Sequence, residues 1–213
     1  PLFFQNVMGF SATDTGLALL PGAIATALSM PIASRVVHRV DGRAIIALGL
    51  ALFAVGCWWM GGMTQSSGYW DVFWPRALQG FALGFLFVPL TTATLSEITR
   101  ERMANATGIY TLVRQLGGSL GIAILVFLQM RYADDAYASL ASGVTGANPA
   151  VEQYMRQMHG SAAQLYTMVM QNATVISYDE VLRLCAIVFI ASIPLVLLLR
   201  WHHGGATGHA AVE

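Results

Sequence analysis

Five stretches of the chain are long and apolar enough to cross a membrane. They are residues 15–34, 44–70, 77–96, 103–130 and 181–199. A hydrocarbon core of about 30 Å needs about 20 residues of helix. A backbone inside lipid must also satisfy its own hydrogen bonds, which a helix does within one segment. The pattern therefore predicts an all-α membrane protein with about five transmembrane helices.

The amino-acid composition agrees with this pattern and excludes several classes of protein. The chain is 56% hydrophobic and 10% charged, whereas soluble domains are about 25% charged. Its 11 basic residues balance 11 acidic ones, so no basic field attracts a nucleic acid. Cys57 and Cys185 lie in apolar stretches with no histidine or cysteine at ligand spacing, which argues against a disulfide framework or a zinc site. We expect no metal, no cofactor and no nucleic-acid partner.

Arginine placement predicts how the helices are oriented. Arginines gather in the loops at residues 35–43 and 97–103, whereas the connection at 61–71 has none. Loops rich in arginine stay in the cytoplasm, so we expect both loops on that side of the membrane. Alternating crossings then place residues 131–178 in the periplasm.

This orientation divides the chain into five parts. We expect the end of a preceding helix and an outer loop at 1–12, four transmembrane helices at 13–130, a periplasmic segment at 131–178, a last transmembrane helix at 179–200 and a cytoplasmic tail at 201–213. Because the first residue is Pro1 rather than methionine, we also expect a fragment of a longer protein.

The periplasmic segment predicts one further helix. Asn148 followed by Pro149 is a good helix start, and apolar residues recur after it at helical spacing. They are Val151, Met155, Met158, Ala162, Leu165 and Met168. Such an amphipathic helix would dock on a partner or on lipid, or it would pack against the protein's own outer surface.

One charge interrupts the fourth apolar stretch. Arg114 is the only charged residue between positions 103 and 130. An ionisable group at bilayer depth is costly unless it faces a polar interior, a partner or a substrate path. We therefore assign Arg114 to a candidate substrate path.

Proline and glycine recur inside the predicted spans. Proline removes a helical hydrogen bond and small residues let helices approach closely, so we expect these spans to be broken, bent or tightly packed, as gated transport needs. The residues are Pro21, Gly80, Gly84, Pro89, Gly117, Gly118 and Gly121. Ordinary packing is the alternative explanation, because both residue types are common in membrane helices.

The first cytoplasmic loop carries a more specific pattern. Residues 34–43 resemble the loop signature of major facilitator transporters, Gly-x-x-x-Asp-Arg-x-Gly-x-Arg, at Arg39 and Arg43. Three positions depart from it: Ser34, His38 and Asp41. In that family the loop clamps one conformation by charge pairing, which implies a gating role for Arg35, Arg39, Asp41 and Arg43. Alternatively, the arginines only fix the orientation.

A longer ordered set of motifs resembles one branch of that family. The motifs are Trp74-Pro75, Gln79-Gly80-Phe81-Ala82, Pro89-Leu90-Thr91-Thr92, Glu101-Arg102 and the run from Arg114 to Gly121. They are similar to those of EmrB/QacA-type drug:proton antiporters, which have fourteen spans. The resemblance covers nearly the whole chain and implies the C-terminal helix bundle of such a transporter.

The same resemblance implies which helices face the substrate. In the family, the counterparts of the first, third and fourth spans line a central cavity. Gln79, Leu83 and Phe87 recur at i, i+4 and i+8 on the third span, so they share one helical face. We expect them to line the path together with Arg114, or else to form a packing or lipid-facing stripe.

The function implied is proton-driven efflux of hydrophobic or cationic small molecules by alternating access, in the bacterial inner membrane. The implied partners are the lipid bilayer, the missing N-terminal half of the transporter, a periplasmic adaptor and an outer-membrane channel. Alternatives are an exporter of a specific metabolite or siderophore, and a membrane scaffold without transport activity. We do not expect an enzyme, because the spans hold no paired catalytic side chains.

Proton coupling requires a titratable group in the path. No span contains an acidic residue at depth, and Asp14, Asp71, Asp179 and Glu180 all lie near the predicted outer ends. We therefore expect the proton carrier in the N-terminal half.

Overall fold

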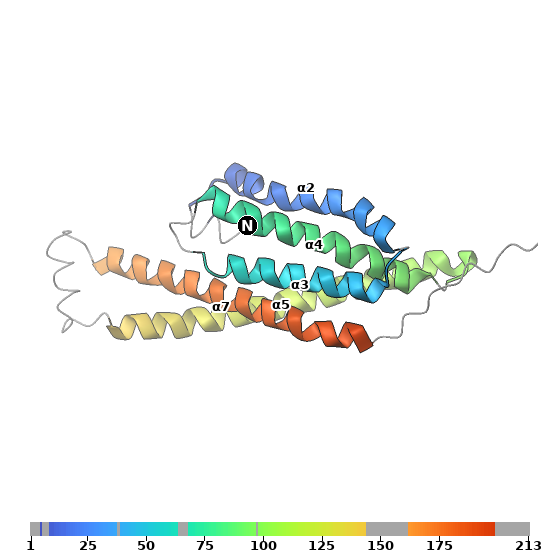
Figure 1. Ribbon diagram of the computed structural model, residues 1–213. Helices are drawn as coiled ribbons and strands as arrows, with labels where there is room; N and C mark the ends of the chain where they lie inside the picture. The colour runs from blue at the N-terminus through green and yellow to red at the C-terminus, as the bar shows by residue number, and fades with distance from the viewer. Residues whose placement is uncertain are drawn as a thin grey trace, which may run out of the picture.

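The computed structural model describes Gln5 and residues 9–37, 39–63, 68–96, 98–143 and 162–198. Long helices make up most of these residues. The helices are α2 (Ala12–Val37), α3 (Gly42–Met60), α4 (Tyr69–Leu95), the short 3-10 helix η1 (Arg100–Arg102), α5 (Met103–Gly143) and α7 (Ala162–Leu198) (Figure 1). No strand occurs in these ranges. Five helices in the described ranges are long and apolar enough to cross a membrane, which confirms the predicted all-α membrane fold.

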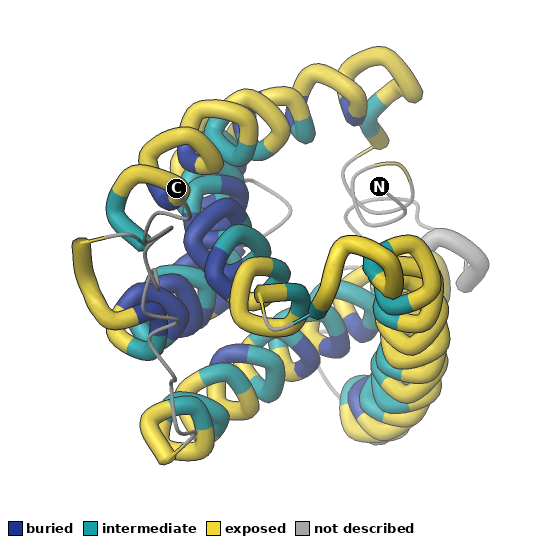
Figure 2. Tube along the Cα trace, turned by 90° about the vertical axis from the view of Figure 1, so that its right-hand side faces the viewer, coloured by how far each residue is buried: buried dark blue, intermediate teal, exposed yellow. Residues whose placement is uncertain are grey.

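The helices form an open row. α4 packs between α2 and α3, α3 packs against α7, and α7 packs against α5. α5 also touches α4, but only at a few residues. Figure 2 looks along the bundle and shows buried residues on the sides that the helices turn toward one another. In α5, by contrast, no residue between 103 and 130 is buried. One side of this helix is therefore open within the described chain.

Small residues set the distance between α2 and α4. A Cβ at Gly80 would lie 2.6 Å from the carbonyl carbon of Gly22 and 2.7 Å from its Cα. A Cβ at Gly84 would lie 2.9 Å from the Cβ of Ser29. Across the same interface, the hydroxyl of Thr26 donates a hydrogen bond to the carbonyl of Gly80 at 2.8 Å. The two helices therefore pack backbone against backbone.

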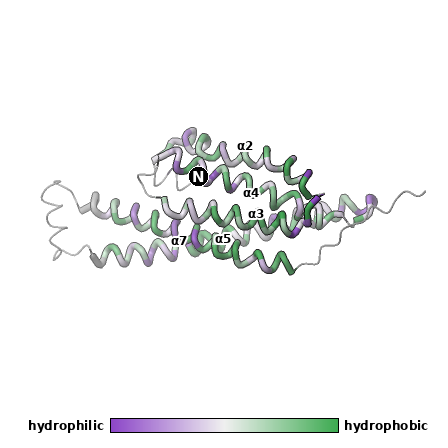
Figure 3. Tube along the Cα trace, in the orientation of Figure 1, coloured by the Kyte–Doolittle hydropathy of each residue, from purple (hydrophilic) through white to green (hydrophobic). Residues whose placement is uncertain are grey.

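Apolar side chains join α3 to its other neighbours. Ile46 and Leu50 of α3 form a buried cluster with Leu86 of α4, and Phe189 of α7 packs against this cluster. The rings of Phe53 and Phe189 lie 4.7 Å apart between centroids. Figure 3 shows that α7 becomes mainly hydrophobic toward its C-terminal end. Because lipid is as apolar as these side chains, close packing rather than removal from water holds the helices together.

The prediction that proline breaks these helices is wrong. Pro21 lies inside a continuous α2, and Pro75 and Pro89 lie inside a continuous α4. Pro21 has no N–H to donate to the carbonyl of Leu17, but the hydroxyl of Tyr69 in α4 donates to that carbonyl at 3.3 Å. A neighbouring helix thus satisfies the group that proline leaves unpaired.

The helices α5 and α7 extend farther than hydropathy predicts. α5 runs to Gly143 instead of ending near residue 130, and α7 begins at Ala162 instead of near residue 179. In Figure 1 both helices project past α2, α3 and α4 at the end predicted to face the periplasm, which we call the outer end. Ala136 is buried in this extension, whereas Asp134 and Asp135 are exposed. Hydropathy indicates which part of a helix suits lipid, and the helix itself continues beyond that part.

Part of the predicted periplasmic segment is not described. The expected helix start at Asn148 and Pro149 lies outside the described residues, as does the expected tail at 201–213. Ala162, Leu165 and Met168 of the amphipathic pattern lie in α7. The end of that pattern and the last membrane helix therefore form one continuous helix.

Candidate functional site

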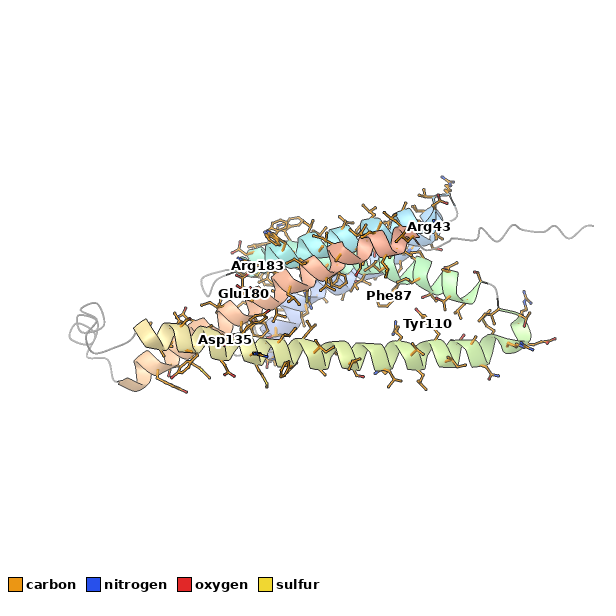
Figure 4. All side chains as sticks on the ribbon, turned by 90° about the horizontal axis from the view of Figure 1, so that it is seen from below. Arg43, Phe87, Tyr110, Asp135, Glu180 and Arg183 are labelled. Atoms are coloured by element: carbon orange, nitrogen blue, oxygen red, sulfur yellow. The ribbon has the colours of Figure 1, made fainter. Side chains whose placement is uncertain are left out.

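Arg114 of α5 contacts a side chain of α4. Its Cζ atom stands 5.2 Å from the ring centroid of Phe87, which is within the range of a cation–π interaction. One turn earlier on α5, the hydroxyl of Tyr110 lies 3.3 Å from the hydroxyl of Thr91 on α4. Figure 4 shows Phe87 and Tyr110 in the space between the two helices. Aromatic and polar groups, rather than aliphatic packing, therefore make this contact.

An open face of α5 continues from this contact. Arg114 is exposed, and no described atom lies within 4 Å of where a Cβ would stand at Gly117, Gly118 or Gly121. A shallow, open hollow lies on the same helix and is lined by residues of α5 alone. Its lining includes Thr107, Thr111, Leu112, Gln115 and Leu116. A mixture of apolar and a few polar groups is typical of small-molecule sites. In the described chain the three glycines leave space rather than fix a helix contact.

Gln79 does not face this open side, which differs from the expected stripe. It is 4% exposed, and its amide nitrogen lies 3.6 Å from the sulfur of Cys57 and 3.7 Å from the sulfur of Met60, both on α3. Leu83 and Phe87 are partly exposed. Each i+4 step turns a helix by about 40°, so Gln79 and Phe87 point about 80° apart. Gln79 therefore packs against α3 and does not share the partly exposed face of Leu83 and Phe87.

Arg76 is a residue that the sequence reasoning missed. It lies inside α4 and is half-buried, and its Nη1 donates to the side-chain oxygen of Gln79 at 2.9 Å. In sequence Arg76 stands close to Trp70 and Trp74, where a charge also fits the end of a span. The available signal was its spacing, because Arg76 precedes Leu83 by seven residues and thus shares its helical face. The partly exposed stripe on α4 is Arg76, Leu83 and Phe87.

The loop motif occupies the inner ends of α2, α3 and α7. Arg35 and Arg39 are exposed, and Asp41 directly precedes α3. Arg43 lies in the first turn of α3, and its Nη1 donates to the carbonyl of Leu197 near the end of α7 at 3.4 Å. A cation at a helix C-terminus stabilises the helix dipole. In this conformation Arg43 joins α3 to α7.

Comparison with known proteins identifies relatives of this chain. The family model described as Major Facilitator Superfamily matches residues 1–122. The chain is 29% identical over 217 residues to the multidrug export protein EmrB of Escherichia coli strain K12, an alignment that covers 98% of this chain and 42% of EmrB. It is 27% identical over 209 residues to the multidrug export protein EmrB of Haemophilus influenzae, covering 94% and 40% of the two chains. It is 26% identical over 225 residues to the fatty acid resistance protein FarB of Neisseria gonorrhoeae, covering 98% and 43%.

These relatives are longer than the chain, which spans about two fifths of their length. The family model nevertheless covers more than half of the chain. With five apolar helices in the part that the structure describes, the chain is a multi-pass protein of the bacterial inner membrane. The chain therefore belongs to the Major Facilitator Superfamily of membrane transporters and is an EmrB-like member of it.

Proposed function

We propose that the chain is part of a proton-driven exporter of hydrophobic or cationic small molecules that works by alternating access. The observation that carries this proposal is the sparse contact between α4 and α5, where Arg114 stands over Phe87. The names of the EmrB relatives, which are multidrug export proteins, support it. The N-terminal half of the same transporter, a periplasmic adaptor and an outer-membrane channel are the proposed partners.

The sparse contact between α4 and α5 suits a helix that moves. Among the described residues, Arg114 contacts Phe87 and Tyr110 contacts Thr91 between their inner parts. A substrate with an aromatic or cationic group would compete for the same ring face and guanidinium. Binding would thereby separate α5 from α4. The helices α2, α4, α3 and α7 would stay packed against one another. Differential contact of this kind is what allows a ligand to shift a conformational equilibrium.

We expect export to depend on the proton gradient. Inside-out vesicles that contain the full-length protein should accumulate a hydrophobic fluorescent drug when respiration acidifies their interior. Addition of nigericin, which collapses the pH difference, should release the drug. Vesicles with Arg114→Ala serve as the matched control. Accumulation that survives collapse of the gradient would contradict proton coupling, and absence of accumulation for every drug tested would contradict export.

A second candidate substrate class is the amphiphilic carboxylates. Two guanidinium groups, Arg76 on α4 and Arg114 on α5, lie in spans without a carboxylate, since positions 72–95 and 103–133 contain no Asp or Glu in sequence. Unpaired cations attract anionic groups more strongly at low dielectric. The relative named fatty acid resistance protein FarB agrees with this class.

Arg76→Gln should separate these two classes. We expect it to reduce export of a long-chain carboxylate by about tenfold relative to export of the matching amide, since a factor of ten corresponds to about 1.4 kcal/mol. The measurement is competition by each compound in the vesicle assay. Arg131→Gln, which removes an exposed charge from α5, should leave the ratio unchanged. Equal loss for carboxylate and amide would exclude charge recognition by Arg76.

A further inference from the structure

Three arginines lie at the inner end of the bundle, which is predicted to face the cytoplasm. Arg35 is in the last turn of α2, Arg39 is in the connection between the helices, and Arg43 is in the first turn of α3. Beneath this connection one buried residue from each of α2, α3 and α4 forms an apolar cluster. The packing of the three helices therefore keeps the three guanidinium groups at the same end.

Arg43 uses little of its hydrogen-bonding capacity. A guanidinium group carries five N–H donors, but among the described residues only the Nη1 of Arg43 has a partner, the carbonyl of Leu197 at 3.4 Å. Its Nε is buried without a partner, whereas Nη2 is not buried. Figure 4 shows Arg43 at the inner end, beside the end of α7. An anion at this place would accept charge-assisted hydrogen bonds, which are stronger than the bond to a carbonyl.

No carboxylate of the neighbouring helices neutralises Arg43. α3 contains no Asp or Glu, and α7 contains none after Glu180. In the sequence, Asp41 is the only acidic residue between positions 35 and 43. Among the described residues, none of the three arginines in this stretch forms an ion pair. The inner end of α3 therefore carries an excess of positive charge.

Exposed leucines lie next to this charge at the end of α7. Leu195, Leu197 and Leu198 are all more than half exposed, and the carbonyl of Leu197 is the one that Arg43 binds. A cation thus stands beside apolar surface where a transmembrane helix ends. An anionic phospholipid has the complementary arrangement, because its charged head group is joined to apolar chains. The cytoplasmic leaflet is also the one whose surface is negatively charged.

We propose that the inner ends of α3 and α7 form a binding site for an anionic phospholipid. A phosphate oxygen of the head group accepts from the Nη2 of Arg43, Arg35 and Arg39 add attraction, and the acyl chains lie along the exposed leucines. Basic pockets between transmembrane helices on the cytoplasmic side bind such head groups in other membrane proteins. Because Arg43 keeps its bond to Leu197, the bound lipid joins α3 to α7. The site does not depend on the proposed export activity.

Native mass spectrometry of the full-length protein in detergent tests this site. Phosphatidylglycerol and phosphatidylcholine with the same acyl chains are added in equal amounts, and the ratio of their one-to-one complexes is measured. We expect the parent to favour phosphatidylglycerol, and Arg43→Gln to lower the ratio roughly fivefold, as expected for one basic side chain near the membrane surface. A ratio unchanged by Arg43→Gln would overturn the proposal.

Arg102 supplies a matched control. It is exposed on η1, at the same end of the bundle, and η1 packs against α5 rather than α7. Arg102→Gln removes the same charge from the same side of the protein and should keep the parental ratio. Equal losses for Arg102→Gln and Arg43→Gln would indicate general attraction to basic loops and would overturn the proposed site.

A conservative variant separates lipid binding from a structural defect. Arg43→Lys keeps the charge but loses the planar fork, so it should keep the ratio within about twofold of the parent. Phosphatidylglycerol should also raise the melting temperature of the parent more than that of Arg43→Gln, because a ligand of the folded state stabilises it. If Arg43→Lys loses as much binding as Arg43→Gln, the effect is structural and the proposal is wrong.

Glycerol 3-phosphate distinguishes a lipid from a soluble phosphate. It carries a phosphate group without acyl chains, so a large excess should leave the phosphatidylglycerol complex intact. Displacement of the lipid by this compound would assign the arginines to a soluble anion and overturn the lipid site. None of these measurements requires transport, so a protein that binds the lipid but exports no drug would support the site and contradict only the proposed function.

Discussion

Replacing Arg114 with alanine in the full-length transporter is expected to reduce drug export about two- to fivefold, since a cation–π contact at an exposed site is worth about 0.5–1 kcal/mol and 1.4 kcal/mol is a factor of ten. The variant loses its contact with Phe87 and the only charge in the apolar part of α5. Because Arg114 is exposed and supports no described core cluster, the amount of protein in the membrane should not change. The measurements are drug accumulation in vesicles and immunoblotting of the membrane fraction.

Two variants distinguish the reasons for this loss. Arg114→Lys keeps the charge without the planar fork of arginine, so partial export is expected if charge is sufficient. Phe87→Leu keeps the apolar volume but removes the ring, and it should reproduce the loss if the cation–π contact matters. Arg131→Ala should export like the parent. If Arg114→Ala also exports like the parent, Arg114 has a structural role only.

The five membrane helices were predictable because each requirement is local. A span needs about 20 apolar residues whatever its neighbours are, and loop arginines report orientation independently of packing. The helix ends were less predictable. Arg131, Asp134 and Asp135 resemble a loop in a hydropathy profile, yet α5 continues through them.

Side-chain directions within the site depended on neighbours that no single stretch of sequence reveals. Gln79 was expected in the substrate path because it is polar in an apolar stripe. Its actual surroundings are Cys57 and Met60 on α3 and Arg76 on its own helix. The partner of Arg114 was also unknown, since Phe87 lies on another helix. Such pairings follow from the order of the helices in the row.

The same limit applies to glycine. Gly80 and Gly121 look alike in sequence, because each lies in an apolar helix with other small residues nearby. In the structure Gly80 meets the backbone of Gly22, whereas no described atom lies within 4 Å of a Cβ at Gly121. Composition therefore indicates where close packing is possible, and the fold decides where it occurs.

Replacing Gly80 with alanine is expected to disrupt the packing of α2 on α4. The added methyl would meet the carbonyl group and Cα of Gly22, and backbone atoms in a helix cannot rotate away. Overpacking a well-packed contact costs about 1–3 kcal/mol when side chains adjust, so a backbone obstruction should cost at least that much. The hydrogen bond from Thr26 to the carbonyl of Gly80 would be strained as well. We expect a lower melting temperature of the detergent-solubilised protein and less protein in the membrane.

Three further variants test whether backbone contact is the cause. Gly16→Ala, in the open part of α2, should be neutral or stabilise by up to about 1 kcal/mol through helix propensity. Gly84→Ala should destabilise less than Gly80→Ala, because it meets the side chain of Ser29. Ser29→Gly should then restore the Gly84→Ala variant but not the Gly80→Ala variant. If Gly80→Ala melts like Gly16→Ala, the interface between α2 and α4 has room for a methyl group, and glycine does not set its spacing.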